Sequence, residues 1–162
     1  MKRILPALLV LVAAAAAPAM ANAGSIKTAD LPDIFKNEPP YIQNQVCGEL
    51  LAGMASLTAD LYAAAGLPAV KEAAIMAGTR AMVLVKANAA LTDAEQARAK
   101  GIAEQLERNA SASKPVITPY QFCEERVQRW LTEGVVTPAD FKAIEADVRA
   151  AIDKATRPAK QP

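Results

Sequence analysis

The chain contains 162 residues, with 18 basic residues, 17 acidic residues, two cysteines and no histidine, and its formal net charge is +1. The lack of histidine excludes Ser-His-Asp and Cys-His nucleophile activation, together with every zinc motif that uses imidazole. The near-neutral charge gives no indication of a nucleic-acid partner. Aromatic residues make up 4% of the chain and alanine is abundant, which favours closely packed helices over a β-rich core.

Residues 1–23 have the pattern of a cleaved signal peptide. Lys2 and Arg3 form a positive start, a short apolar run follows, and residues 21–23 read Ala-Asn-Ala, a small-x-small cleavage site. The apolar run is shorter than the roughly 20 residues that span a bilayer. No cysteine stands directly after the cleavage site, which argues against a lipid anchor. We therefore expect a chain exported to the periplasm or secreted, and not an integral membrane protein.

The chain that remains after cleavage is long enough for one domain. About 139 residues can bury one hydrophobic core and are too few for two ordinary domains. We expect an N-terminal arm at residues 24–39, a helical domain at 40–155 and a disordered tail at 156–162.

The arm carries apolar side chains among prolines and charges. Pro32 and Pro39 divide it into pieces that are too short to form a stable helix alone. Its apolar side chains therefore need cover, either by folding back on the core of the domain or by docking on another protein. The candidate interaction residues, with one aromatic residue that follows the arm, are Ile26, Leu31, Ile34, Phe35 and Tyr41.

Two long helices are expected at residues 40–65 and 68–89. Pro40 and Pro68 suit the first helical turn, where the N–H that proline lacks would have no partner. Gly66 suits the left-handed residue that ends a helix. The second helix is apolar around most of its circumference, so we expect it to lie at the centre of the bundle.

Three further helices are expected at about 92–109, 119–134 and 138–155. The first opens with a capping box, in which Thr92 and Glu95 bond to each other's backbone amides. Each of the other two begins with a capping threonine and a proline at the first helical position. The predicted fold class is therefore all-α, a small single-domain bundle of four to five helices stapled by one disulfide.

The two cysteines are expected to form this disulfide, with a structural role. Cys47 and Cys123 each lie on the apolar face of a predicted helix, and an oxidising compartment allows one intramolecular pairing. Two free buried thiols and an intermolecular bridge are the alternatives. A redox-active pair would normally be close in sequence, as in C-x-x-C, which the chain lacks.

The sequence "LTDAEQ" resembles the LTxxQ signature of helical periplasmic stress chaperones, with Gln96 one position late. This resemblance implies a chaperone-like role and covers only the start of one helix. In size, predicted export and cysteine content the chain is also similar to small helical immunity proteins that neutralise periplasmic toxins. No motif is shared with those proteins, and we assign the chain to neither family.

Carboxylates are the remaining candidates for catalysis. A bridge between the cysteines would bring Glu49 near Glu124 and Glu125, and a glycosidase needs only two acids that flank a bond. Nothing in their spacing marks an acid held in an apolar pocket, so we interpret them as solvated charges. We expect no catalytic residue, no cofactor and no metal site.

The function that these observations favour is a non-enzymatic protein-interaction module of the periplasm or medium, with an inhibitor, immunity or chaperone-like role. Its expected partner is another periplasmic or secreted protein, and no nucleic acid. The first alternative is a carrier whose helices enclose a small apolar ligand. The second alternative is a carboxylate-based hydrolase of cell-wall glycan.

Overall fold

The structure, a computed structural model, describes residues 31–88, 91–113 and 117–156, without the side chains of 110–113, 117 and 118. Within these residues it contains six helices and no strand. The helices are α2 (Asp33–Lys36), α3 (Pro40–Ala65), α4 (Pro68–Lys86), α5 (Asp93–Ser113), α6 (Ile117–Thr132) and α7 (Pro138–Ala155). The all-α class is confirmed, whereas the predicted number of four to five helices was too low because α2 was not expected. The predicted signal peptide, Ile26 and residues 157–162 lie outside the described residues.

Most helix ends follow the local signals of the sequence. Gly66 has a φ of 68°, a left-handed conformation that ends α3, and its amide bonds to the Tyr62 carbonyl oxygen. The Thr137 hydroxyl accepts a hydrogen bond from the Asp140 amide at 3.1 Å and caps α7. The capping box before α5 is also present, with Glu95 and Thr92 bonding to each other's amides.

Four boundaries differ from the prediction by two residues or more, and one of them is the end of α6 at Thr132 rather than at residue 134. Helix α4 ends at Lys86 rather than at residue 89, and α5 continues to Ser113 rather than ending near 109. Helix α6 begins at Ile117, so Pro119 occupies its first turn instead of the first helical position. A proline is tolerated there because the amides of a first helical turn have no partner within the helix.

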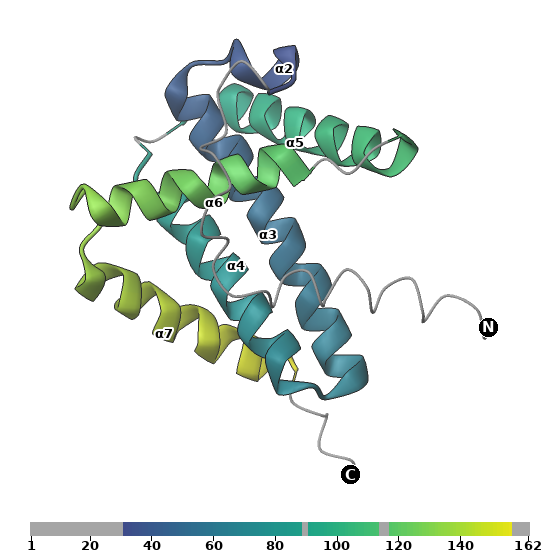
Figure 1. Cartoon of the computed structure of the whole chain (residues 1–162), viewed down its shortest axis with the longest axis vertical. Helices are drawn as coiled ribbons and strands as arrows, with labels where there is room; N and C mark the ends of the chain where they lie inside the picture. Colours follow the sequence, from purple (N-terminus) through teal and green to yellow (C-terminus); the bar gives the residue numbers. More distant parts are fainter. Residues whose placement is uncertain (1–30, 89–90, 114–116, 157–162) are drawn as a thin grey trace.

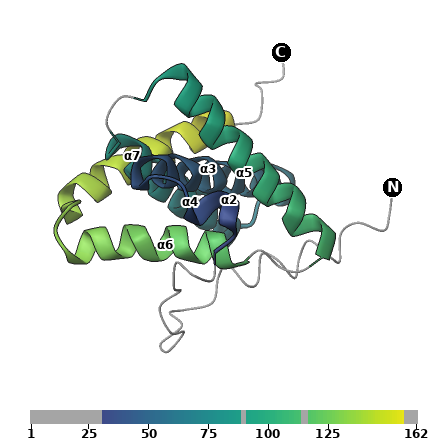
Figure 2. The same ribbon diagram turned by 90° about the horizontal axis from the view of Figure 1, so that it is seen from above.

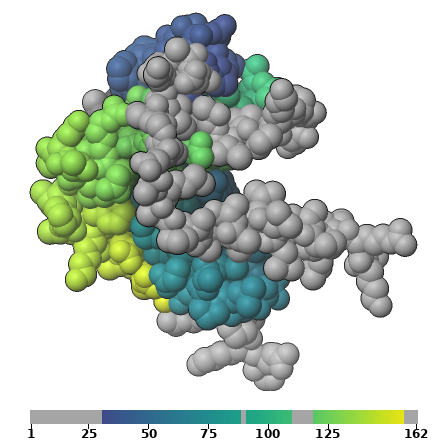
Figure 3. Space-filling view, in the orientation of Figure 1, coloured from purple at the N-terminus to yellow at the C-terminus, as the bar shows by residue number. Residues whose placement is uncertain are grey.

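Helices α3 and α4 form an antiparallel pair through the middle of the molecule, and the other helices pack around it (Figure 1). Helix α5 packs on α3, α6 crosses both central helices, and α7 packs along α4. Seen from above, α5 and α6 lie on opposite sides of the central pair (Figure 2). The turn between α3 and α4 lies at the end of the central pair that is far from α2 (Figure 1), and Figure 3 shows the teal residues of this end below the green residues of α6. Among the described residues, no helix is both long and apolar enough to span a membrane.

The core is concentrated where α5 and α6 cross the central pair. The main cluster of buried residues includes Phe35 of the short helix α2, Leu50 and Leu51 of α3, Leu84 of α4 and Leu106 of α5. A second cluster lies between α4 and α7 and is much smaller, with buried members Ala74, Ile75 and Ile152. The two ends of the central helix pair are therefore unequally covered.

Candidate functional site

The predicted pairing of Cys47 with Cys123 is confirmed. The bond joins α3 to α6, with a Cα–Cα distance of 5.3 Å, and both cysteines are fully buried. Because the two positions are 76 residues apart, the cross-link restricts the unfolded chain and contributes on the order of 4 kcal/mol in the chain-entropy model. The bond fixes the middle of α6 against the first half of α3.

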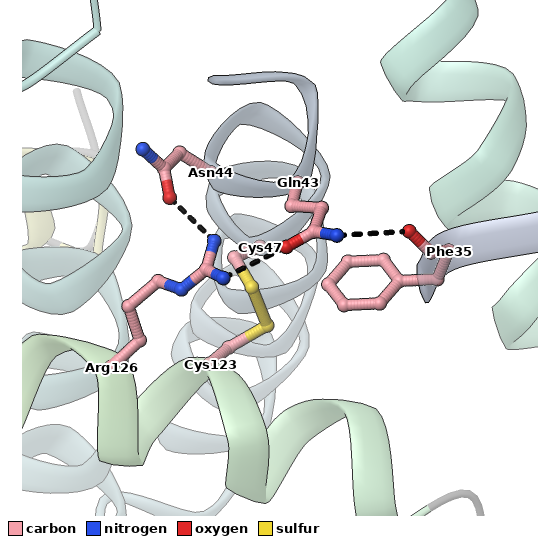
Figure 4. The surroundings of a disulfide bond; sticks show 6 residues. All are labelled: Phe35, Gln43, Asn44, Cys47, Cys123 and Arg126. Carbon is pink, nitrogen blue, oxygen red and sulfur yellow. Dashed lines mark hydrogen bonds between the residues drawn. A yellow bond between two sulfur atoms is a disulfide. The ribbon is translucent and has the colours of Figure 1, made fainter. Parts of the chain in front are cut away.

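A polar network surrounds the disulfide (Figure 4). The guanidinium of Arg126 donates to Asn44 Oδ1 at 2.6 Å and to Gln43 Oε1 at 2.8 Å. Asn44 Nδ2 in turn donates to Asn88 Oδ1, and Asn88 Nδ2 donates to the Tyr41 carbonyl oxygen. The network therefore connects α6, the start of α3 and the residues that follow α4.

The aromatic side of this site consists of two phenylalanines. The guanidinium carbon of Arg126 lies 4.6 Å from the centroid of the Phe122 ring, within cation–π distance. Phe122 meets Phe35 of α2 edge to face, with centroids 5.5 Å apart. Burial lowers the pKa of Arg126 to about 10, and repulsion by the neighbouring Arg129 acts in the same direction. The guanidinium is thus a cation held in a partly desolvated position.

The candidate interaction residues of the arm divide into buried and exposed positions. Leu31 and Phe35 are buried in the main core cluster, and Ile34 is half-buried against it. At these three residues the arm folds back on the core, which is the first of the two predicted alternatives. Tyr41 is exposed, and its pKa is raised by partial desolvation and by a hydrogen bond to Glu95. Whether any of them contacts a partner stays a prediction.

A groove opens between the end of α4, the loop after α6 and the start of α7. We call it the α4–α7 groove. Its volume is about 340 Å³, and it is open to solvent. The lining residues are Val83, Lys86, Ala87, Val135, Val136, Asp140, Ala143 and Ile144. Its buried members provide an apolar floor, whereas Val135 stands on the rim with 59% of its surface exposed.

The conformation of the loop explains the exposure of Val135. Gly134 has a φ of 72°, which reverses the chain after α6. The amides of Val135 and Val136 then both donate to the Trp130 carbonyl oxygen, at 2.9 and 3.3 Å. This turn resembles a helix C-cap in which amides that follow the helix bond to one of its last carbonyl oxygens. The turn holds Val135 outside the core.

The acids considered for glycan hydrolysis are engaged in other contacts. Glu124 accepts a hydrogen bond from Arg80 at 2.5 Å and forms an ion pair with it. Glu49 accepts from Gln45, one turn earlier on α3, at 3.0 Å. Glu125 also takes part in an interaction. These contacts favour structural roles for the carboxylates.

Two side chains that are not among the predicted site residues, Gln43 and Arg126, are central to the network. A signal for them existed in the spacing. Gln43 stands four residues before Cys47, and Arg126 stands three residues after Cys123. Residues three or four apart share one helix face, so a disulfide between the cysteines also brings their one-turn neighbours together.

The structure defines the class of the described residues as an all-helical domain with one disulfide. No family model, no curated protein and no solved structure matches the chain.

Proposed function

We propose that the chain is an exported, non-enzymatic protein-interaction module and that the α4–α7 groove is its docking surface. The observation that carries this proposal is the exposed apolar rim residue Val135 above the buried floor of the groove. A disulfide between helices distant in sequence is typical of proteins that work outside the reducing cytosol. The inhibitor, immunity and chaperone-like roles all require such a docking surface.

The construction of the groove suits an apolar anchor from a partner. Interfaces depend on a few side chains that fill well-packed pockets, with polar groups around them that exclude water. Val83 and Ile144 form a floor from two different helices, and Lys86 and Asp140 add polar groups to the lining. An inserted apolar side chain from a periplasmic or secreted protein would complete this arrangement.

The test compares two exposed apolar residues on different surfaces. Val135→Glu places a charge on the groove rim, and Leu57→Glu places the same charge on α3, where Leu57 is 56% exposed. Each variant, and the unaltered chain, is used as bait in periplasmic extract of the source organism, and captured proteins are quantified by mass spectrometry. We expect the V135E variant to lose about tenfold or more of a captured partner, because a docked partner would cover the new carboxylate, and burying an unpaired charge costs more than the roughly 1.4 kcal/mol that corresponds to tenfold.

The L57E variant should retain the partner. Both substitutions lie at exposed positions and should leave the free energy of unfolding within about 0.5 kcal/mol of the original value. Equal capture by the V135E variant and the unaltered chain would reject the groove as the docking surface. A loss confined to the L57E variant would move the docking surface to α3.

The groove also supports one second candidate, a carrier of a small apolar ligand. Its volume of about 340 Å³ falls at the lower end of the range of roughly 300–1,000 Å³ that is typical of ligand pockets. Organic extraction of the purified protein followed by mass spectrometry would reveal a bound lipid or other apolar compound. A stoichiometric compound that is lost in the Val135→Glu variant would favour the carrier, whereas an empty extract would leave the interaction module preferred.

A further inference from the structure

Two neighbouring arginines of α6 differ from the other described arginines in their partners. Four arginines form ion pairs with carboxylates, and these are Arg80, Arg98, Arg108 and Arg149. Arg126 and Arg129 form no ion pair with any described residue, and they lie one turn apart on the same helix. The described arginines without an ion pair are therefore gathered at one place.

Arg126 is the more unusual of the two because it is half-buried. A guanidinium removed from water is costly unless an opposite charge or several hydrogen bonds compensate it. The acceptors that the fold supplies to Arg126 are the neutral side-chain oxygens of Asn44 and Gln43. These amides orient the guanidinium without neutralising its charge. Burial, together with repulsion by Arg129, also lowers the pKa of Arg126.

The guanidinium is also held in a fixed orientation. Two amide oxygens engage one N–H on each terminal nitrogen, and the Phe122 ring lies beside its carbon at 4.6 Å. Arginine has five N–H donors, so three remain that no hydrogen bond within the described residues uses. A pre-oriented cation of this kind loses little side-chain entropy when it binds an anion.

We propose that Arg126 and Arg129 form an anion site that receives a carboxylate side chain from an acidic segment of a partner protein. One half-buried guanidinium balances one negative charge, and its planar donors match the two oxygens of a carboxylate. Arg129, which is exposed, adds a second positive charge one turn further along α6. The proposal does not depend on the α4–α7 groove, which is lined by other residues.

The experiment uses the full chain labelled with ¹⁵N and follows the Nε–Hε resonances of its arginines at low ionic strength. The probes are a hexaglutamate peptide, a hexaglutamine peptide and inorganic phosphate. We expect hexaglutamate to shift the Arg126 and Arg129 resonances saturably, while hexaglutamine leaves them unchanged. Arg126→Gln should weaken hexaglutamate binding about tenfold or more, because hydrogen bonds to charged groups contribute roughly 1.5–3 kcal/mol.

The matched control is Arg108→Gln, which removes the same charge from the surface of α5. It should leave the affinity for hexaglutamate nearly unchanged. Equal weakening by R108Q and R126Q would show that only net charge matters and would overturn the proposal. Absence of a saturable shift at Arg126 would overturn it as well. Tighter binding of phosphate than of hexaglutamate would overturn the assignment to a carboxylate.

Arg126 also belongs to the polar network, so Arg126→Gln removes two of its hydrogen bonds and can disturb folding. A second variant therefore tests the site without changing the network. Arg129→Gln changes an exposed residue outside the network and should leave the far-UV circular dichroism spectrum unchanged. We expect it to weaken hexaglutamate binding severalfold. Unaltered binding in R129Q, together with unaltered binding in a folded R126Q, would reject the site.

Discussion

Gln43 shows how one polar side chain can hold the arm against the bundle. It is 6% exposed, and its amide nitrogen donates to the carbonyl oxygens of Lys36 at 3.2 Å and Glu38 at 2.9 Å. The last carbonyls of a helix have no partner within that helix, and α2 has only four residues. Gln43 supplies that partner, while its oxygen accepts from Arg126. The arm is therefore fixed by polar contacts as well as by Phe35.

We expect Gln43→Ala to lower the free energy of unfolding by about 1–3 kcal/mol. The change leaves partly buried carbonyl groups and one N–H of Arg126 without their partner, which costs part of the desolvation of those groups. Urea denaturation followed by circular dichroism measures the effect. Gln45→Ala is the control, because Gln45 bonds only one turn along α3 and should change stability by less than about 0.5 kcal/mol. Equal effects of the two substitutions would contradict the role of Gln43.

At the scale of single helices, much of the fold could be predicted because helix ends are encoded locally. The ends of α3 and α7 agree with the prediction, since Pro40, Gly66 and Pro138 act through their own backbone preferences. Helix α2 could not be predicted in this way. Four residues are too few to be stable alone, and α2 depends on burial of Phe35 in a core that distant helices build.

The candidate site was predictable only where its residues share a face with the cysteines. The disulfide follows from two inward-facing thiols, and Arg126 and Gln43 lie one turn from them. The α4–α7 groove could not be predicted, because it depends on how the loop at Val135 is placed against α4. Periodicity shows which face of a helix is buried and does not show which other helix covers it.

Two glycines within helices give a paired prediction. A Cβ added at Gly101 of α5 would meet nothing within 4 Å, so Gly101→Ala should raise the free energy of unfolding by about 0.5–1 kcal/mol through helix propensity. A Cβ added at Gly78 of α4 would lie 2.8 Å from Val148 Cγ1 and would push α7 away from α4. We expect Gly78→Ala to be destabilising by about 1–3 kcal/mol, as overpacking usually is.

Thermal or urea denaturation of both glycine variants checks this pair. Stabilisation by Gly78→Ala would show that Val148 moves aside at little cost, and would contradict close packing of α7 on α4. Destabilisation by Gly101→Ala would contradict the open surroundings of that position on α5.

At the scale of the whole molecule, the bundle has a strong end and a weak end. The main cluster joins α2, α3, α4, α5 and α6 around large buried side chains, and the disulfide crosses it. Helix α7 adds one buried residue to it, Ile144. The interface of α7 with α4 contains the small second cluster, and charges lie along its edges. Arg149 of α7 donates to Glu72 of α4 at 2.7 and 2.8 Å, and Lys71 pairs with Asp153. Ionic contacts therefore make up a larger share of the attachment of α7.

This difference predicts that acid releases α7 before the rest of the bundle. Hydrogen bonds from Arg149 hold the pKa of Glu72 below its ordinary value. A carboxylate with a lowered pKa in the folded state contributes stability above its unfolded pKa, and this contribution is lost as the pH falls through the folded value. Below about pH 4.3, the ordinary pKa of glutamate, the docking of α7 should therefore weaken progressively.

Hydrogen exchange detected by mass spectrometry measures this release peptide by peptide, after correction for the intrinsic effect of pH on exchange. Between pH 7 and pH 3 we expect the protection of α7 to fall further than that of the first half of α3, where Ile42, Leu50 and Leu51 belong to the main cluster. Glu72→Gln should reduce the protection of α7 already at pH 7 and flatten its pH dependence. Glu104→Gln, which removes a carboxylate paired with Arg108 within α5, should do neither. If α3 and α7 lose protection together at every pH, the molecule unfolds as one unit, and the prediction that α7 detaches first is wrong.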